Sequence, residues 1–227
     1  KILEINTDLD RFLYSVSHEL RTPICNGLGL VNLIRSVDDK KLINEIADKL
    51  EASIQSQDAL LQKIGMYTQI VRQDIVYEQI NLQSLLDNCL SALSDTEGFA
   101  QVSFRTKIQN DHPVLSNRKS LEILLTNLIS NAIKFRRHTG ALAVIEIKGS
   151  EEDFRIKVSD NGRGIDRKYL NDIFKVFYKA NIISDGQGLG LYLVSKIVET
   201  LNGTIHVDSD LGAGAKFEVV FPTRKLE

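Results

Sequence analysis

The chain has 227 residues and a nearly balanced charge, with 28 Lys and Arg against 30 Asp and Glu and a formal net charge of −2. This balance gives no electrostatic reason to expect a nucleic-acid or anionic membrane partner, although charge alone excludes neither. No stretch approaches the ~20 apolar residues that cross a bilayer, so we expect no membrane segment in this part of the protein. The length suits two domains better than one. Cys25 and Cys89 lack paired spacing, which favours reduced, packed thiols in a cytosolic environment.

The N-terminal part predicts two amphipathic helices. Apolar side chains recur every three or four residues in a stripe made of Ile5, Leu9, Phe12, Val16, Leu20, Ile24, Leu28 and Val31. The pattern breaks at residues 36–39 and resumes from Ile43 to Tyr67, which predicts an antiparallel hairpin. Two helices cannot cover their own apolar stripe, so we expect a second copy to complete a four-helix bundle. The helical pattern begins at the first residue, so we expect this chain to be part of a longer protein.

A polar heptapeptide, Ser17-His18-Glu19-Leu20-Arg21-Thr22-Pro23, lies within the first helix. At 100° per residue, His18 falls away from the apolar stripe, and Thr22 follows one turn later on the same flank. The imidazole should therefore be accessible to another molecule. Pro23 cannot donate to the carbonyl of Glu19 and should bend the helix here. Taken alone, an exposed helical histidine is most often an ordinary surface residue.

From about Ile80 the pattern changes, and we place the domain boundary after residue 75, giving domains 1–75 and 76–227. Helices are predicted at 82–93, 117–135 and 189–201, and strands at 102–106, 143–148, 153–159, 204–208 and 215–221. Helices and mostly antiparallel strands in this order predict an α/β sandwich of the α+β class, with the helices on one face of the sheet.

Two asparagines, Asn127 and Asn131, share a helical face with Leu124 and Leu128. Buried amides need hydrogen-bond partners, and nearby backbone is one possibility. The other is that the Asn131 carbonyl oxygen ligates Mg²⁺ while Lys134 reaches a phosphate. A neutral amide suits this role because it supplies oxygen without adding negative charge beside a triphosphate.

Asp160 ends an alternating strand and should point toward the core, where an adenine amino group is a suitable donor. Gly162 and Gly164 would leave room for a base, although Asp-x-Gly-x-Gly also marks simple turns.

A third segment, Gly186 to Leu191, runs into a helix, so that its N–H groups can converge on phosphate. It is not a P-loop, because no Gly-Lys-Ser/Thr follows, and it is not a Rossmann motif, because no strand precedes it.

Residues 17–23 resemble, position for position, the phosphoacceptor box of sensor histidine kinases. The Asn127–Phe135, Asp160–Ile165 and Gly186–Leu191 segments resemble, in this order, the N, G1 and G2 boxes of the ATP-binding fold shared by histidine kinases, gyrase, heat-shock chaperones and mismatch-repair ATPases. Residues 173–179 resemble the F box that anchors the ATP lid. The resemblance covers nearly the whole chain and indicates the catalytic core of a two-component sensor histidine kinase. It implies a helical hairpin forming a dimeric four-helix bundle, then an α/β-sandwich ATPase domain of the histidine kinase, gyrase and chaperone type.

The resemblance also implies roles for individual residues. His18 would attack the γ-phosphate of ATP, Glu19 would orient the imidazole and accept its proton, and Thr22 would help to place a water for dephosphorylation. ATP and Mg²⁺ would be the cofactors, with Asn131 as the metal ligand. The implied nucleotide site comprises Asn127, Asn131, Lys134, Phe135, Asp160, Gly162, Gly164, Ile165, Lys179, Gly186, Gly188, Leu189 and Gly190.

Lys179 stands where the family more often has Arg, which replaces a bidentate fork by a point charge. The implied partners are a second copy of the chain and the receiver domain of a response regulator, whose aspartate would take the phosphoryl group. We expect no nucleic-acid partner and a cytoplasmic location, with the cytoplasmic part of a membrane-bound sensor left open. Two alternatives remain: an ATPase of the same fold in which nucleotide gates dimerisation, and a non-catalytic dimer scaffold.

Overall fold

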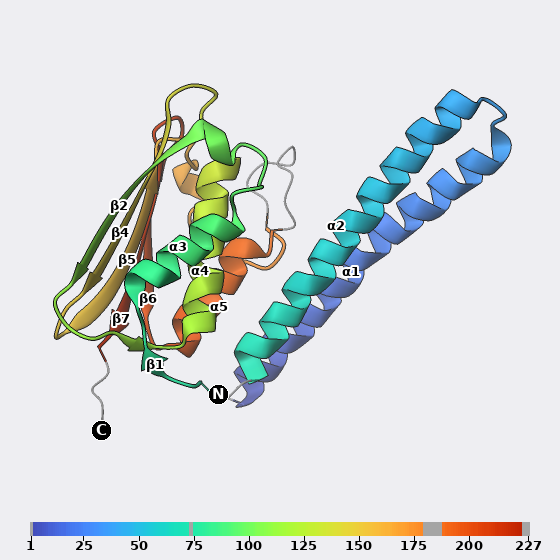
Figure 1. Cartoon of the computed structure of the whole chain (residues 1–227). Helices are drawn as coiled ribbons and strands as arrows, with labels where there is room; N and C mark the ends of the chain where they lie inside the picture. The colour runs from blue at the N-terminus through green and yellow to red at the C-terminus, as the bar shows by residue number, and fades with distance from the viewer. Residues whose placement is uncertain (1, 73–74, 179–187, 224–227) are drawn as a thin grey trace. The chain divides into compact units, whose positions relative to one another are not determined.

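The computed structural model describes residues 2–72, 75–178 and 188–223 (Figure 1). The chain divides into two compact units, residues 1–68 and residues 69–227. The boundary between domains 1–75 and 76–227 remains a prediction from the sequence. Among the helices of the described part, none is both long enough and apolar enough to cross a bilayer.

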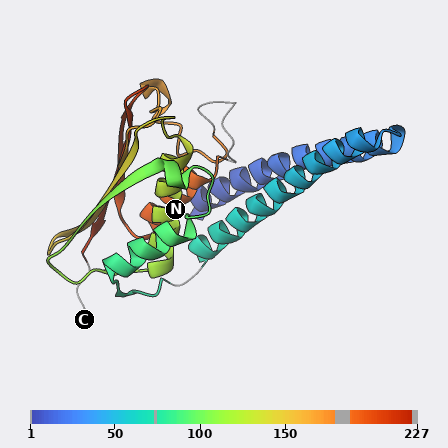
Figure 2. The same ribbon diagram turned by 45° about the horizontal axis from the view of Figure 1, so that its top comes forward.

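The first unit is an antiparallel helical hairpin, as predicted. Helix α1 (Ile2–Ser36) passes through Pro23 without a break in its helical assignment, and α2 (Lys40–Arg72) runs back beside it (Figures 1 and 2). Asp39 caps the start of α2, because its Oδ1 accepts a hydrogen bond from the N–H of Lys41 at 2.8 Å and its carbonyl accepts one from Ile43 at 2.9 Å. The rings of Phe12 and Tyr67 join the two helices with centroids 4.0 Å apart.

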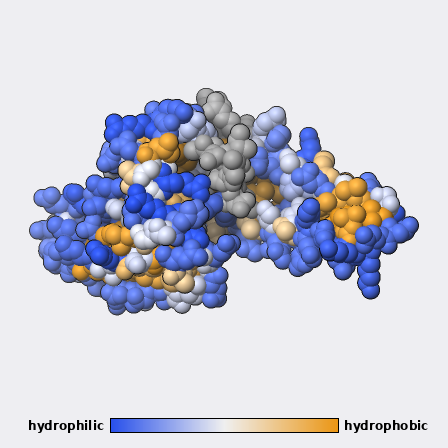
Figure 3. Space-filling model, turned by 90° about the horizontal axis from the view of Figure 1, so that it is seen from above, coloured by the Kyte–Doolittle hydropathy of each residue, from blue (hydrophilic) through white to orange (hydrophobic). Residues whose placement is uncertain are grey.

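The hairpin buries only part of its apolar stripe. Phe12 and Val16 are buried, whereas Ile24 and Leu28 are 52% and 62% exposed. Further exposed apolar side chains on the two helices are Leu13, Tyr14, Leu33, Leu42, Ile54, Leu61 and Met66. Figure 3 shows apolar surface, in orange, on the helical hairpin. One hairpin therefore leaves an apolar surface that a partner could cover.

The second unit is a five-stranded sheet with three helices on one face (Figure 2). The strand order is β2 (Val102–Asn110), β4 (Ala141–Gly149), β5 (Asp153–Asp160), β7 (Gly214–Pro222) and β6 (Thr204–Asp210). The β2–β4 pair is parallel and the other pairs are antiparallel, in agreement with a mostly antiparallel prediction. The helices are α3 (Leu82–Ala92), α4 (Arg118–Lys134) and α5 (Gly190–Thr200), and α4 packs against both of the others.

The core lies between the sheet and these helices because the strands alternate. Ile145, Ile156 and Val158 are buried, while Glu146 and Lys157 face away and form an ion pair at 2.6 Å. The buried face of α4 comprises Leu121, Leu124, Leu125, Leu128, Ile129, Ala132 and Ile133. This packing fixes the end of β5 and the C-terminal half of α4 against one another, and these are the two elements that carry the predicted N and G1 boxes.

Four short elements were not predicted. Strand β1 (Glu78–Gln79) pairs with β3 (Leu115–Ser116), and the N–H of Ile80 continues this pairing to the carbonyl of Val114 at 2.8 Å. Single-turn 3₁₀ helices lie at Phe99–Gln101 (η1) and Arg167–Tyr169 (η2). Segments of two or three residues are too short to show a period in the sequence.

Candidate functional site

His18, Glu19 and Thr22 lie on one turn of α1. The side chains of His18 and Glu19 are 68% and 37% exposed, and Nδ1 of His18 lies 3.7 Å from Oε1 of Glu19. The Thr22 hydroxyl donates to the backbone carbonyl of His18 at 3.5 Å. Nε2 of His18 makes no hydrogen bond to any of the described residues. The structure therefore confirms an accessible imidazole, with a carboxylate beside Nδ1 and Nε2 open to another molecule.

The two asparagines of α4 differ in their partners. Asn127 donates from Nδ2 to the carbonyl of Ile123 at 2.8 Å, which is the backbone alternative raised from the sequence. Its Oδ1 faces the start of α5, where a Cβ on Gly190 would lie 2.8 Å from that oxygen. The Asn131 side chain makes no hydrogen bond to any residue in the described ranges, and it is only half-buried. The Asn131 amide is thus the one open to a ligand.

Helix α4 ends at the predicted nucleotide loop. The carbonyl of Phe135 accepts a hydrogen bond from the N–H of Arg163 at 3.0 Å, and a Cβ on Gly162 would overlap that carbonyl oxygen. The Phe135 ring has two cations over it, with Lys134 Nζ 5.3 Å and Arg163 Cζ 5.1 Å from the centroid. Phe135 is therefore joined to the loop that follows Asp160, and Lys134 lies beside its ring.

Asp160 is half-buried at the end of β5 and is held by one of its two carboxylate oxygens. Its Oδ1 accepts hydrogen bonds from the N–H groups of Gly162 at 2.8 Å and Ala215 at 3.4 Å. Burial raises the pKa of this carboxyl above its ordinary value, although the two N–H donors act in the opposite direction. Its Oδ2 accepts no hydrogen bond from the described residues. Asp160 therefore presents a fixed acceptor that lacks a donor from the described part of the protein.

The turn between β6 and β7 closes over the loop after Asp160. Gly164 has φ +67°, and a Cβ there would overlap the carbonyl of Asp210, so only glycine allows this approach. The N–H of Ile165 donates to the hydroxyl of Ser209 at 2.8 Å. Gly164 and Ile165 thus link the predicted G1 box to β6.

Gly188 and Phe177 lie against each other at the two ends of the segment 179–187. Gly188 has φ +67°, and a Cβ there would lie 2.5 Å from the carbonyl carbon of Phe177. Phe177 itself has φ 56°, a left-handed conformation that is uncommon for an aromatic residue. Leu189 is 1% exposed and anchors the start of α5 at Gly190. Two predicted site residues, Lys179 and Gly186, lie outside the described residues.

The donor chemistry at Asn131 fits Mg²⁺. Mg²⁺ prefers oxygen ligands and usually keeps water and phosphate oxygens in its coordination shell. No cluster of three or more His, Cys, Asp or Glu occurs in the part of the chain that the structure describes. A single amide oxygen beside a polyphosphate therefore suits a magnesium ion that takes most of its ligands from nucleotide and water.

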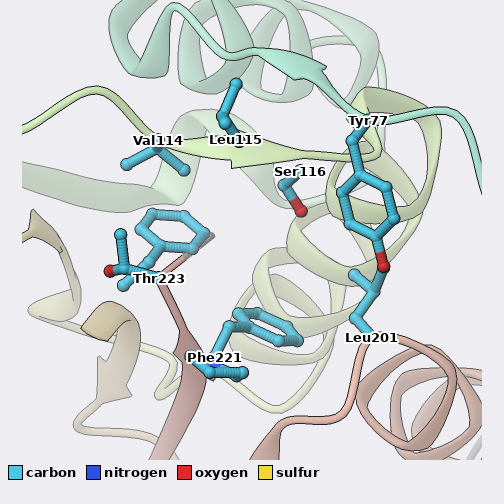
Figure 4. Close-up of a pocket in the computed structure, with 9 residues that line it drawn as sticks. Tyr77, Val114, Leu115, Ser116, Leu201, Phe221 and Thr223 are labelled. Atoms are coloured by element: carbon cyan, nitrogen blue, oxygen red, sulfur yellow. The ribbon is translucent and has the colours of Figure 1, made fainter. Parts of the chain in front are cut away.

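A separate small pocket lies at the other end of the sheet (Figure 4). Its lining includes Tyr77, Ser116, Phe154, Leu201 and Phe221. Phe154 precedes Asp160 by six residues on β5, so this pocket is roughly 20 Å from the Asp160 carboxylate. It is thus not part of the predicted nucleotide site.

Several contacts in the site could not be foreseen. Ser209, Asp210 and Ala215 contact Asp160 or the loop after it, but they belong to no predicted motif. The only signal in the sequence was the glycine pair, Gly212 and Gly214, which predicts a hairpin turn. The glycine pair predicts the turn, but it does not predict that the turn packs against a loop about fifty residues earlier in the sequence.

Comparisons with known proteins agree with this fold. Residues 116–225 match the family described as histidine kinase-, DNA gyrase B- and HSP90-like ATPase. The sensor histidine kinase GacS of Pseudomonas protegens is 30% identical over 226 residues, which is 95% of this chain and 25% of GacS. This chain therefore spans about a quarter of the length of that relative.

Two solved structures share the fold. Histidine kinase ThkA in complex with the response regulator TrrA has a TM-score of 0.74 and 21% identity, covering 99% of this chain and 64% of that one. Full-length ShkA in complex with AMPPNP has a TM-score of 0.64 and 24% identity, covering 94% of this chain and 46% of that one.

The sheet, the three helices on one face and the matched residues 116–225 define an ATPase domain of the histidine kinase, gyrase B and HSP90 type. With the preceding helical hairpin and a sensor histidine kinase relative that matches 95% of its length, the chain has the organisation of a histidine kinase catalytic core.

Proposed function

We propose that this chain is the catalytic core of an ATP-dependent protein-histidine kinase that phosphorylates its own His18. The observation that carries the proposal is the half-open carboxylate of Asp160, with Oδ1 held by two N–H groups and Oδ2 without a donor from the described residues. An adenine amino group supplies the missing donor. The ATPase family of residues 116–225 and the AMPPNP complex of ShkA support ATP as the nucleotide.

The proposed nucleotide site combines the three boxes. The carboxylate of Asp160 selects adenine, while Asn127, Phe135, Gly162, Gly164 and Ile165 shape the walls around the base and sugar. Phosphates meet the N-terminus of α5 through Gly186, Gly188, Leu189 and Gly190, with Lys134 and Lys179 as cations. Asn131 holds Mg²⁺, which neutralises charge on the phosphates when it is bound.

The proposed chemistry at His18 follows from the two ring nitrogens. With Glu19 as the acceptor for the Nδ1 proton during the reaction, the lone pair lies on Nε2 and points outward. Nε2 attacks the γ-phosphorus in line, the N–P bond forms, and the bond from phosphorus to the β,γ-bridging oxygen breaks to release ADP. The positive charge that develops on the ring is stabilised by Glu19, which accepts the Nδ1 proton. The product is a phosphohistidine.

The proposed partners are a second copy of the chain and a response regulator. The exposed apolar side chains of α1 and α2 form a surface that a second hairpin would cover to complete a four-helix bundle. The phosphoryl group of His18 then passes to an aspartate of a receiver domain, a partner that the complex of ThkA with TrrA supports. We place the protein in the cytoplasm, where ATP and receiver proteins are found.

Incubating the purified protein with ATP labelled at the γ-phosphate tests the proposal. Covalent label on the protein is expected if the chain is a kinase. Free labelled phosphate without covalent label would instead indicate an ATPase in which nucleotide gates dimerisation. The absence of both products would indicate a non-catalytic scaffold. Either of these results would overturn the proposal.

We also propose a phosphatase activity that uses Thr22. Its hydroxyl lies one turn from His18 and is placed by the hydrogen bond to the His18 carbonyl, so it can orient a water toward a phosphorylated receiver docked on α1. Thr22→Ala is expected to slow phosphate release from a phosphorylated receiver by about tenfold or more while leaving the labelling of His18 intact. Equal release rates for the variant and the wild type would contradict this role.

A further inference from the structure

Ser209 is one of only two buried polar side chains among the described residues, the other being Ser116. Their exposed fractions are 5% and 4%. The hydroxyl of Ser209 makes two hydrogen bonds: it donates to the carbonyl of Gly214 at 2.6 Å and accepts from the N–H of Ile165 at 2.8 Å. One buried hydroxyl thus satisfies a carbonyl on β7 and an N–H in the loop after Asp160.

Two further contacts join the same loop to the same turn. The N–H of Gly212 donates to the carbonyl of Arg163 at 2.6 Å. The guanidinium of Arg167 donates to both carboxylate oxygens of Asp210, at 2.6 and 2.8 Å, in a bidentate pair. The Arg167 pair is exposed, with side-chain exposures of 74% and 54%, so the buried Ser209 hydroxyl is the contact that water does not replace.

These contacts continue directly to the Asp160 carboxylate. Ser209 pairs with Ala215 across the β6–β7 ladder, and the N–H of Ala215 is the second donor to Oδ1 of Asp160. A Cβ on Gly214 would overlap the Asp160 carbonyl, so β7 lies directly against the end of β5 at this point. Ser209 therefore holds both the donor strand and the loop that flank Asp160.

We propose that Ser209 is a positioning residue for base recognition, acting through its two hydrogen bonds to fix the carboxylate of Asp160 and the Gly162–Ile165 loop against the nucleotide base. The inference rests on the proposed binding of ATP at Asp160. Loss of the Ser209 hydroxyl leaves the N–H of Ile165 and the carbonyl of Gly214 without their buried partner. The loop then becomes more mobile at the position where the base is selected.

The test compares Ser209→Ala with Ser116→Ala, which removes an equally buried hydroxyl at the far end of the sheet (Figure 4). ATP and GTP are titrated against each purified full chain, and thermal unfolding is measured without nucleotide. Ser209→Ala is expected to raise the Kd for ATP about tenfold and to reduce the preference for ATP over GTP severalfold. Ser116→Ala is expected to leave both values as in the wild type.

If Ser209 has only a structural role, Ser209→Ala will lower the melting temperature and weaken the binding of ATP and of GTP by the same factor. That result would overturn the inference, as would an unchanged Kd for ATP. Ser209→Thr, which keeps the hydroxyl, is expected to restore most of the preference. If Ser209→Ala does not fold, Ser209→Cys decides, because a thiol fills the same space but is a much weaker hydrogen-bond donor and acceptor. It should reduce the preference for ATP over GTP, and an unchanged preference would overturn the inference.

The proposed function and the role of Ser209 can be tested independently of each other. If the wild type does not bind ATP, or if Asp160→Asn leaves the preference for ATP over GTP unchanged, then the assignment of the base site to Asp160 is wrong. If Asp160→Asn removes the preference and Ser209→Ala does not alter it, only the role of Ser209 is wrong.

Discussion

Replacing His18 by alanine is expected to abolish the covalent label that the protein acquires from γ-labelled ATP. The label should be stable in base and labile in acid, as expected for a phosphorus–nitrogen bond to imidazole. His18 is the exposed nucleophile beside a carboxylate, with Nδ1 3.7 Å from Oε1 of Glu19, and alanine removes the attacking lone pair altogether. The incorporation of label per chain, measured after denaturing electrophoresis, gives the result.

His112→Ala is the matched control, because His112 is also exposed but lies in a loop of the second unit and belongs to no motif. It should incorporate label as the wild type does. ATP binding by His18→Ala should also be unchanged, since no box of the nucleotide site includes α1. Label that persists in His18→Ala would show that another residue is the acceptor and would overturn the proposed mechanism.

Asp160→Asn is expected to weaken ATP binding by roughly 100-fold while the nucleotide-free protein remains folded. The amide oxygen can still accept the hydrogen bonds of Gly162 and Ala215, so the loop keeps its anchor. The amide nitrogen then replaces Oδ2, and its N–H groups meet the amino group of adenine donor to donor. Titration of ATP against the variant measures the loss, with the exposed Asp95→Asn as the control.

The same substitution should not destabilise the protein without nucleotide at neutral pH. Burial raises the pKa of Asp160 in the folded state, so the folded protein keeps this proton to a higher pH than the unfolded chain does. The free energy of unfolding therefore falls as the pH rises through the interval between the ordinary and the raised pKa. Asn lacks this loss, so thermal unfolding should give a melting temperature equal to or above that of the wild type above that interval. A clearly lower melting temperature would show that the ionised carboxylate supports the fold.

The helical segments were the most predictable part of the molecule. The period of the apolar residues in the first 70 positions identified both helices and the turn at residues 36–39, since an exposed helix pair must alternate polar and apolar faces. Asn117 and Asn81 were less obvious as helix starts, yet each caps its helix by accepting an N–H three residues later at 2.9 Å.

The candidate site was predictable only where one segment carries its own chemistry. Local spacing predicted an accessible imidazole at His18 and a core-facing carboxylate at Asp160, while their roles came only from the resemblance. The structure shows an exposed imidazole and a carboxylate with one oxygen held. The hydrogen bond from Asn127 to the carbonyl of Ile123 shows the limit of such reasoning, because an amide on the predicted face is partly used by its own helix.

The sequence by itself determined the helical hairpin, the order of the boxes and the residue types at each of them, because these depend on spacing within one helix, strand or turn. Only the tertiary structure decided what holds Asp160 and its loop, since the contacts of Ala215, Ser209 and Phe135 join residues 28 to 55 positions apart in the sequence. Contacts of that kind depend on which strands are neighbours and in which register. The pairing of β5 with β7 joins strands far apart in the sequence, and no local pattern in either strand specifies it.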